Sequence, residues 1–360
     1  MSLKIAIIGC GKIADAHVEE IRKIPSASLV AVCDLEPIMA EQLATRFAVP
    51  LWYNDFARML DEQKPDVVHI TTPPDSHLAL VRQALAAGCH VFLEKPVAPR
   101  AAEVRAILDA SSSANRQLTV NYWPNFEVHA IALRQLIASG ELGEIVHLES
   151  YYGYDLAGEY GMALRRDPNH WVHRLPGKLF QNVLDHMLNK IVPYLADDDP
   201  ILDAVAYCGA PLAERLQTNP LLDELRIVLQ GANSSAYATF SAHARPIGHR
   251  LRVYGTRNTA TADFQLRTVT MDRKQTFPSA LGRLAPPFLL AKDSLRQGIR
   301  NMNHFAHARF HYFHGMHHLL AEFYTGIETN APPPIPYGEI LRVATWMDRI
   351  FQQVYPEVPA

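Results

Sequence analysis

Short runs of apolar residues recur through the first 122 residues, and stretches with the helical spacing of apolar positions separate them. The runs predict five strands, at roughly Leu3–Ile8, Leu29–Cys33, Val67–Thr71, His90–Leu93 and Leu118–Asn121. Helix ends between them are indicated by Asn54 at one start, Asp75 or Ser76 at another, and Gly88 at an end. Strands that alternate with helices predict a parallel sheet with right-handed crossovers. This region is therefore predicted to be a doubly wound α/β domain.

Beyond residue 122 the pattern changes to short strand-like runs between turns of Gly, Asn and Pro. The predicted strands are Ile145–Tyr154, Leu202–Cys208, Leu225–Gln230, Ser235–Ala242, Arg250–Gly255 and Thr259–Phe264. An amphipathic helical pattern returns from Gly338 to Gln353. The second region is thus rich in strands and ends in a helix.

Composition narrows the class of protein. A chain of 360 residues, 48% of them hydrophobic, can bury the cores of two domains. No apolar run approaches the ~20 residues of a membrane span, so we expect no stable membrane insertion. A net charge of -3 argues against nucleic acid as a partner and favours a small-molecule substrate. Four scattered cysteines and an N-terminus without a secretion leader predict a cytoplasmic protein without disulfides.

The turn after the first predicted strand reads Gly9-Cys10-Gly11-Lys12-Ile13-Ala14, the G-x-G-x-x-G/A pattern between a strand and a helix. Such a turn lets the backbone approach a diphosphate at the helix N-terminus, as in the Rossmann fold. Asp34 closes the second strand, where its carboxylate can bind a ribose diol and would repel a 2'-phosphate. This favours NAD over NADP as cofactor; the alternative is an Asp that only caps the helix before Pro37.

The stretch from His90 to Val97 reads as a buried strand that ends in Glu94, Lys95 and Pro96. Because the carboxyl ends of parallel strands line ligand clefts, we expect Lys95 to point into a cleft. The Lys95-Pro96 bond can be cis at modest cost. The alternative is a surface Lys after an edge strand.

Three stretches resemble the Gfo/Idh/MocA oxidoreductase family in order and spacing: Gly9–Ala14, Thr71–His77 and Ala87–Pro96. The likeness extends through Gly140–Ile145, Pro176–His186 and Pro332–Pro334 and is weakest at 273–318. It implies an NAD-binding Rossmann domain at 1–122, with a helix at 333–360 packing back on it. The remainder, 123–332, would be an α+β domain with an open, mainly antiparallel sheet for substrate binding and oligomerisation.

The resemblance also implies a function. The chain would be an NAD-dependent oxidoreductase that oxidises a hydroxyl of a sugar, cyclitol or sugar derivative, anionic or nucleotide-linked ones included, by hydride transfer to nicotinamide. Cofactor contacts are expected from Gly9, Gly11, Lys12, Ile13, Asp34, Thr72, Pro73, His77, Glu94 and Lys95. Two alternatives stay open, an NAD-dependent glycosidase that uses transient oxidation and a non-catalytic NAD-binding regulatory protein. The presence of Lys95 and His186 favours catalysis.

The segment Gly177 to His186 resembles the family's second signature, with Asn182 in place of an Asp and His186 at the His position. On one helix, positions 182 and 186 share a face. Imidazole is the side chain that titrates near neutral pH, and an amide only forms hydrogen bonds. We therefore expect Lys95 and His186 to be the catalytic residues, Glu94 to hold Lys95, and Asn182 to orient the substrate.

Other substrate contacts are expected around the same segment. Basic residues crowd its approach: Arg165, Arg166, His170, His173, Arg174 and Lys178, opposed only by Asp167. They either recognise an anionic substrate, with Arg174 as a fork, or form a solvated loop. Tyr122 and Trp171 either stack on a sugar ring or fill core space. Asn125 stands where many relatives carry Arg.

Two further features lie in the region of weakest resemblance. His304, His307, His311, His314 and His318 recur at spacings of three and four. We expect them on one helix, without a metal, because no carboxylate or Cys completes a ligand set. Ahead of them, apolar residues from Pro286 are interspersed with Lys292, Arg296 and Arg300. That stretch either contacts a membrane or lipid-linked substrate or, as we favour, covers a cleft.

Assembly is the last expectation. An open sheet with helices on one face needs cover on the other. We expect a homodimer or homotetramer through the exposed sheet face, with Ala236, Ala238 and Phe240 as its apolar surface.

Overall fold

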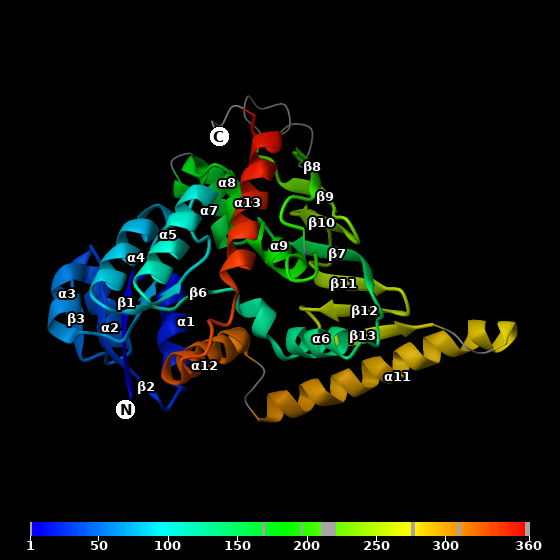
Figure 1. The fold of residues 1–360 in the computed structure, drawn as a ribbon, viewed down its shortest axis with the longest axis horizontal. Coiled ribbons are helices and arrows are strands. Elements are labelled where there is room, and N and C mark those ends of the chain that lie inside the picture. Colours follow the sequence, from blue (N-terminus) through cyan, green and yellow to red (C-terminus); the bar gives the residue numbers. More distant parts are fainter. Residues whose placement is uncertain are drawn as a thin grey trace. The chain divides into compact units, whose positions relative to one another are not determined.

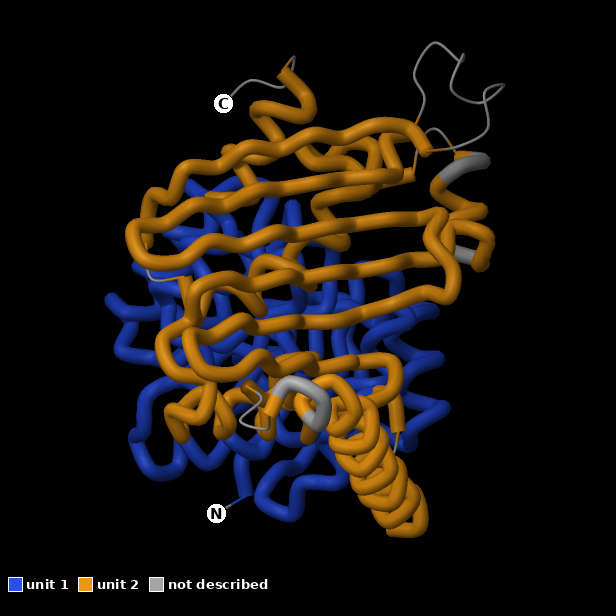
Figure 2. The backbone as a smooth tube through the Cα atoms, turned by 90° about the vertical axis from the view of Figure 1, so that its right-hand side faces the viewer, with its two compact units in different colours: residues 1–123, 313–345 blue, residues 124–312, 346–360 orange. Residues whose placement is uncertain are grey.

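The computed structural model describes residues 2–167, 170–195, 197–209, 221–274, 278–307 and 311–356. The chain folds into two compact units. Unit 1 comprises residues 1–123 and 313–345, and unit 2 comprises 124–312 and 346–360 (Figure 2). No described helix is long and apolar enough to cross a bilayer.

Unit 1 is built on a six-stranded parallel sheet in the order β3-β2-β1-β4-β5-β6 (Figure 1). Its strands are β1 (Leu3–Ile8), β2 (Ala27–Cys33), β3 (Leu51–Tyr53), β4 (Val67–Ile70), β5 (His90–Leu93) and β6 (Leu118–Val120). This order places the switch point between β1 and β4 and is that of a Rossmann fold, so the predicted fold class is confirmed. The prediction missed β3, a three-residue edge strand too short to give an alternating pattern.

Unit 1 also contains the helices between these strands and one helix that follows residues 124–312 of unit 2 in the sequence. They are α1 (Lys12–Ile21), α2 (Pro37–Arg46), α3 (Phe56–Gln63), the short η1 (Pro74–Ser76), α4 (His77–Ala86), α5 (Ala101–Ser113) and α12 (His314–Thr329). The predicted cap at Asn54 was wrong by one residue, because the Asp55 carboxylate accepts the hydrogen bond from Arg58 N. Gly88 ends α4 as predicted, with φ of +85° and the two backbone bonds of a Schellman motif.

Unit 2 is built on a seven-stranded sheet in the order β13-β12-β11-β7-β10-β9-β8. The strands are β7 (Ile145–Gly153), β8 (Ile201–Tyr207), β9 (Glu224–Gln230), β10 (Ser235–Ser241), β11 (His249–Gly255), β12 (Asn258–Asp263) and β13 (Thr268–Arg273). All pairs are antiparallel except β7 with β10. The mainly antiparallel sheet is confirmed, and β13 is a strand that the prediction missed.

Helices of unit 2 cover one face of its sheet, except α11, which lies along the edge strand β13 (Figure 1). They are α6 (Val128–Ala138), α7 (Glu159–Arg166), η3 (Trp171–Arg174), α8 (Lys178–Val183), α9 (Asp185–Ile191) and α11 (Ser279–Ala306). Two elements join the units in sequence: the short η2 (Trp123–Phe126), and α13 (Tyr337–Val354), which contributes residues to both. No described helix crosses the face of the sheet turned to the viewer in Figure 2.

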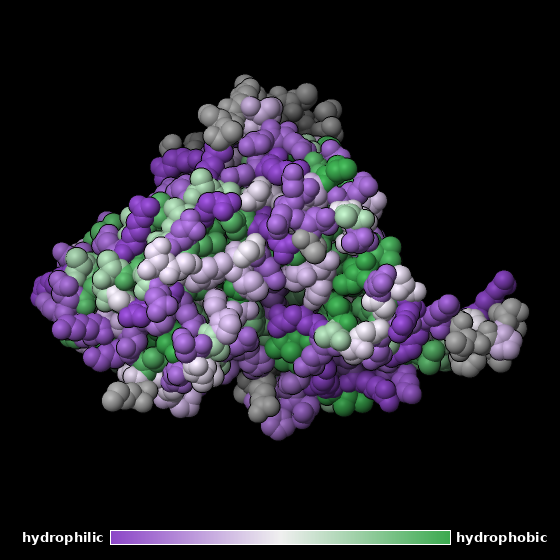
Figure 3. All heavy atoms as spheres, viewed as in Figure 1, coloured by the Kyte–Doolittle hydropathy of each residue, from purple (hydrophilic) through white to green (hydrophobic). Residues whose placement is uncertain are grey.

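The apolar surface expected for assembly was placed on the wrong face. Ala236, Ala238 and Phe240 are fully buried, and the Phe240 ring lies 5.9 Å from that of Phe180 in α8. Because side chains alternate along a strand, the open face instead carries residues such as Tyr237. Its other exposed apolar side chains include Ile201, Val205 and Val228, and Figure 3 shows hydrophobic residues at the margin over these strands. Homo-oligomerisation stays a prediction.

The prediction that the five histidines lie on one helix was also wrong. His304 lies in α11, which ends at Ala306, whereas His314 begins α12 and His318 lies inside it. The two helices belong to different units. His307 and His311 lie between the two helices and belong to neither, so the spacing of three and four did not indicate one helix.

Candidate active site

The turn after β1 has the geometry of a diphosphate site. Gly9 has φ of +97°, and a Cβ there would lie 2.8 Å from the backbone of Thr71 and Thr72, so only glycine fits. Gly11 precedes α1 with an extended backbone, and a Cβ there would meet no atom within 4 Å. The open space at Gly11, beside the first N-H groups of α1 from Lys12 and Ile13, fits the diphosphate of a dinucleotide.

The Asp34 carboxylate lies directly against this turn. Its Oδ2 accepts a hydrogen bond of 2.6 Å from Cys10 N, and its Oδ1 accepts one of 2.9 Å from Glu36 N. The side chain is half-buried at the end of β2. The two interpretations of Asp34 are therefore compatible, since one carboxylate contacts both the glycine turn and the start of the next helix.

The loop after β4 forms the other wall of the turn. Thr72 Oγ1 lies 2.6 Å from Ser76 Oγ. His77 is buried, with Nε2 2.9 Å from Thr72 O and Nδ1 2.9 Å from Val97 O. His77 thus connects the loops that follow β4 and β5. The predicted cofactor contacts of Thr72, Pro73 and His77 stay predictions, and a buried His77 would act by holding Thr72 in place.

A buried hydrogen-bond chain that the sequence did not reveal starts at Glu94, at the end of β5. Glu94 Oε1 lies 2.8 Å from His17 Nε2 and accepts a bond of 2.5 Å from Asn121 Nδ2. His17 Nδ1 lies 2.8 Å from His69 Nδ1, and His69 Nε2 lies 2.7 Å from Tyr324 Oη. All five side chains are buried. The chain joins α1, β4, β5, the end of β6 and α12.

One arrangement of protons gives each link between Tyr324, His69, His17 and Glu94 one donor and one acceptor. Burial raises the pKa of Tyr324 and lowers that of His69 well below its ordinary value, so the first is a hydroxyl and the second is neutral. In this arrangement the Tyr324 hydroxyl donates to His69 Nε2, and the His69 proton lies on Nδ1, facing His17 Nδ1. His17 then donates from Nε2 to Glu94.

Glu94 is the end point of all these donors. Burial alone would raise the pKa of its carboxyl, but the hydrogen bonds from His17 and Asn121 outweigh burial and hold the pKa below its ordinary value. Its Oε2 also accepts a bond of 3.0 Å from Lys95 N. An ionised Glu94 thus fixes the backbone at Lys95, which is half-buried and followed by a cis peptide to Pro96. Tyr122, just beyond β6, is buried.

Asn182 and His186 do not lie on one uninterrupted helix. Asn182 is in α8, and α9 begins anew at Asp185 because both Met187 N and Leu188 N donate to Leu184 O. Leu184 keeps right-handed helical angles, so the backbone continues to turn in the same sense from α8 into α9. Both are half-buried. The His186 ring lies 5.0 Å from that of Tyr152.

Beside His186 lies a second polar cluster that sequence reasoning missed. Lys190 Nζ donates to His186 O and lies 4.8 Å from the Phe264 ring centroid. The rings of His249 and His129 lie 4.4 and 4.7 Å from the same ring. Burial lowers the pKa of Lys190 to about 7 and that of His129 to about 3. A lysine four residues after His186, among the apolar Met187, Leu188 and Ile191, was the available signal.

The remaining candidates in unit 2 are less closely grouped. Arg174 is exposed, and the Trp171 ring stacks on His170 at 5.7 Å. The side chains of Arg165 and Arg166 lie outside the described part of the structure. Asn125 Nδ2 donates to Asn189 O at 3.1 Å, one residue from Lys190. In the described residues no group of three or more His, Cys, Asp or Glu side chains is arranged to hold a metal ion.

Comparison with known proteins supports this description of unit 1. The model of the GFO_IDH_MocA family, described as an oxidoreductase family with an NAD-binding Rossmann fold, matches residues 3–122. D-glucoside 3-dehydrogenase of Escherichia coli is 35% identical over 144 residues, 40% of this chain and 41% of that protein. Inositol 2-dehydrogenase of Rhizobium meliloti is 25% identical over 271 residues, 74% and 77% of the two chains. The chain thus matches less than half the length of the first relative.

Solved structures share the fold over the whole chain. An oxidoreductase from Agrobacterium radiobacter, in complex with NAD+, L-tartaric acid and magnesium, has a TM-score of 0.76 at 17% identity and covers 99% of this chain and 98% of its own. UDP-N-acetylglucosamine 3-dehydrogenase GnnA from Acidithiobacillus ferrooxidans has a TM-score of 0.71 at 17% identity, with 99% of each chain covered. The family model confirms the resemblance over residues 3–122, and these solved structures show that the fold extends over the whole chain.

Replacing Lys190 by Met tests the buried amine. Its folded pKa of about 7 lies below the 10.5 of a free lysine, so the unfolded chain binds more protons between these pH values and stability rises with pH. Urea unfolding measures this effect. From pH 7 to pH 9 the free energy of unfolding of the wild type should increase by roughly 2 to 3 kcal/mol more than that of Lys190→Met. The exposed Lys274→Met is the control. A difference that does not depend on pH would show that Lys190 is not buried as described.

Proposed function

We propose, on the premise that residues 3–122 are the NAD-binding Rossmann domain of the GFO_IDH_MocA oxidoreductase family, that the chain oxidises a hydroxyl of a sugar, cyclitol or sugar derivative with NAD. One observation carries the proposal. The glycine turn after β1, Asp34 after β2 and Lys95 after β5 follow strands of one parallel sheet, so they share its carboxyl edge. Relatives named for glucosides and inositol support a polyol substrate.

The chain's own residues have separate tasks in this proposal. Lys95, held at its backbone by ionised Glu94, donates a hydrogen bond to the reacting oxygen and stabilises the charge that develops there. His186 accepts the hydroxyl proton, and Asn182 orients a neighbouring hydroxyl. When bound, the nicotinamide supplies the hydride acceptor. The exposed Arg174 and half-buried Trp171 serve as contacts for an anionic group or sugar face.

NAD is the proposed cofactor in preference to NADP. The carboxylate of Asp34 would repel a 2'-phosphate placed near the glycine turn, to which it is bonded through Cys10 N. Asn at this position keeps one acceptor oxygen and removes the charge, whereas Ala removes both.

Titration of NADH and NADPH into the wild type and these variants separates the two effects. Wild type should bind NADH about tenfold or more tightly than NADPH, and Asp34→Asn should narrow that ratio, with a slightly lower melting temperature because one backbone N-H loses its acceptor. Equal affinity of the wild type for both cofactors would contradict the role given to Asp34. If the preference for NADH were lost in Asp34→Ala but retained in Asp34→Asn, it would depend on the geometry of the turn and not on the charge of Asp34.

Kinetics of Lys95→Ala and His186→Ala test the reaction itself. A panel of sugars, cyclitols and nucleotide sugars with NAD+ identifies a substrate through NADH formation. Each variant should then lower kcat roughly a hundredfold or more and leave NADH affinity within about twofold. Lys4→Ala, at the opposite, amino edge of the same sheet, is the matched control and should retain full turnover. Full turnover by Lys95→Ala would refute the proposed mechanism.

A further inference from the structure

Helix α11 presents a continuous apolar stripe to solvent. The stripe consists of Leu284, Phe288, Leu295, Ile299 and Met302, which are 63%, 75%, 67%, 58% and 71% exposed. Their spacings of four, seven, four and three residues place all five on one face of the helix. At 1.5 Å per residue the stripe is about 27 Å long. Figure 1 shows α11 as a single long helix beside β13.

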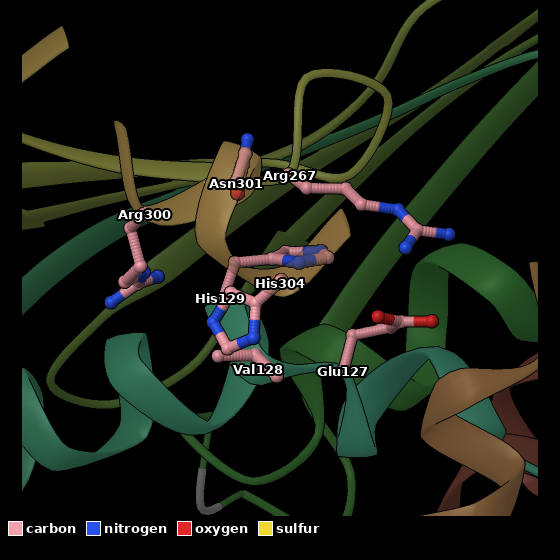
Figure 4. A pocket seen from close by; sticks show the side chains of 7 residues that line it. All are labelled: Glu127, Val128, His129, Arg267, Arg300, Asn301 and His304. Carbon is pink, nitrogen blue, oxygen red and sulfur yellow. The ribbon is translucent and has the colours of Figure 1, made fainter. Parts of the chain in front are cut away.

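The inward face of the same helix is polar. Asp293 forms an ion pair of 2.8 Å with Arg273 of β13, and Asn301 Nδ2 donates to Leu266 O at 2.9 Å. Figure 4 shows Arg300, Asn301 and His304 of α11 around a small pocket, with His129 of α6 and other residues on its far side. A surface helix ordinarily turns its apolar face to the core. Because α11 turns its polar face inward and its apolar stripe to solvent, the stripe does not contribute to the core of unit 2.

Charge identifies the chemistry that the stripe suits. Lys292 and Arg296 are exposed and lie one to four residues from stripe members, along one flank of the stripe. Arg283 is exposed and directly precedes Leu284, the first member of the stripe. Across residues 282–307 the single acidic residue is Asp293, and Arg273 neutralises it. An apolar face flanked by cations is the pattern of a helix that lies in the interface of an anionic bilayer.

We propose that the α11 stripe docks this protein onto an anionic lipid membrane surface. The helix lies parallel to the surface, with the stripe among the acyl chains nearest the headgroups and Lys292 and Arg296 at the lipid phosphates. A second copy of the chain is the other partner to consider. An antiparallel pair of stripes would place Lys292 and Arg296 of one copy beside those of the other, without a carboxylate between them, which disfavours that pairing.

Co-sedimentation of the full chain with vesicles tests the proposal. Wild type should bind vesicles of phosphatidylcholine mixed with phosphatidylglycerol, bind those of phosphatidylcholine alone weakly, and lose binding as salt rises. Leu295→Ser with Ile299→Ser should lower binding about tenfold or more. Lys292→Gln with Arg296→Gln should lower it roughly fivefold per cation removed.

Two matched double variants control for general changes in the surface. Ile201→Ser with Val205→Ser removes apolar side chains of similar exposure, 62% and 63%, from β8. Arg82→Gln with Arg105→Gln removes the same charge from exposed positions of α4 and α5. Both should bind vesicles like the wild type. Binding that the stripe variants do not reduce would overturn the proposal. The proposal would also be overturned if the wild type did not bind vesicles. If Leu295→Ser with Ile299→Ser then had half the wild-type mass in light scattering, the stripe would be an interface between two copies.

Discussion

The buried carboxylate of Glu94 is the constraint on which the carboxyl edge of the unit 1 sheet depends. A buried charge is tolerated only when hydrogen bonds replace water, and here His17, Asn121 and the Lys95 backbone N-H supply them. His17 belongs to the helix that starts at the glycine turn, and Asn121 directly follows β6. Glu94 therefore ties the helix after the glycine turn, the end of β6 and the Lys95 backbone into one rigid edge. Removing one donor would leave a buried charge poorly compensated, at a cost of about 1 to 3 kcal/mol.

Local sequence signals were sufficient for most of the first unit. The strand around Ile5, the glycine turn and the Schellman end at Gly88 each depend on residues within one turn of the chain, and each prediction held. The failures were short or ambiguous elements. β3 spans three residues. In β10, Ala236 and Tyr237 both suit a strand, and only the position of the helices decides which of the two faces solvent.

The polar chains of the candidate site were beyond sequence reasoning, because their members meet only in the fold. His17 and His69 are 52 residues apart, and Tyr324 follows His69 by 255. His69 within the apolar strand Val67–Ile70 signals a buried imidazole that needs a partner, but not which one. Likewise, Lys190 showed only its spacing from His186; its contact with Phe264 depends on how α9 packs in unit 2. Residues that bond to neighbours in sequence were found, and residues paired by topology were not.

The central claim is that the turn after β1 holds the diphosphate of NAD, and Gly11→Val tests it most directly. A Cβ at Gly11 meets no atom within 4 Å, and the backbone there is extended, so valine fits the fold and fills only the space assigned to the diphosphate. NADH titration, followed by energy transfer from tryptophan, should show saturable binding to the wild type and at least about a hundredfold weaker binding to the variant, with the melting temperature nearly unchanged. Undiminished NADH binding by a folded Gly11→Val protein would contradict the account.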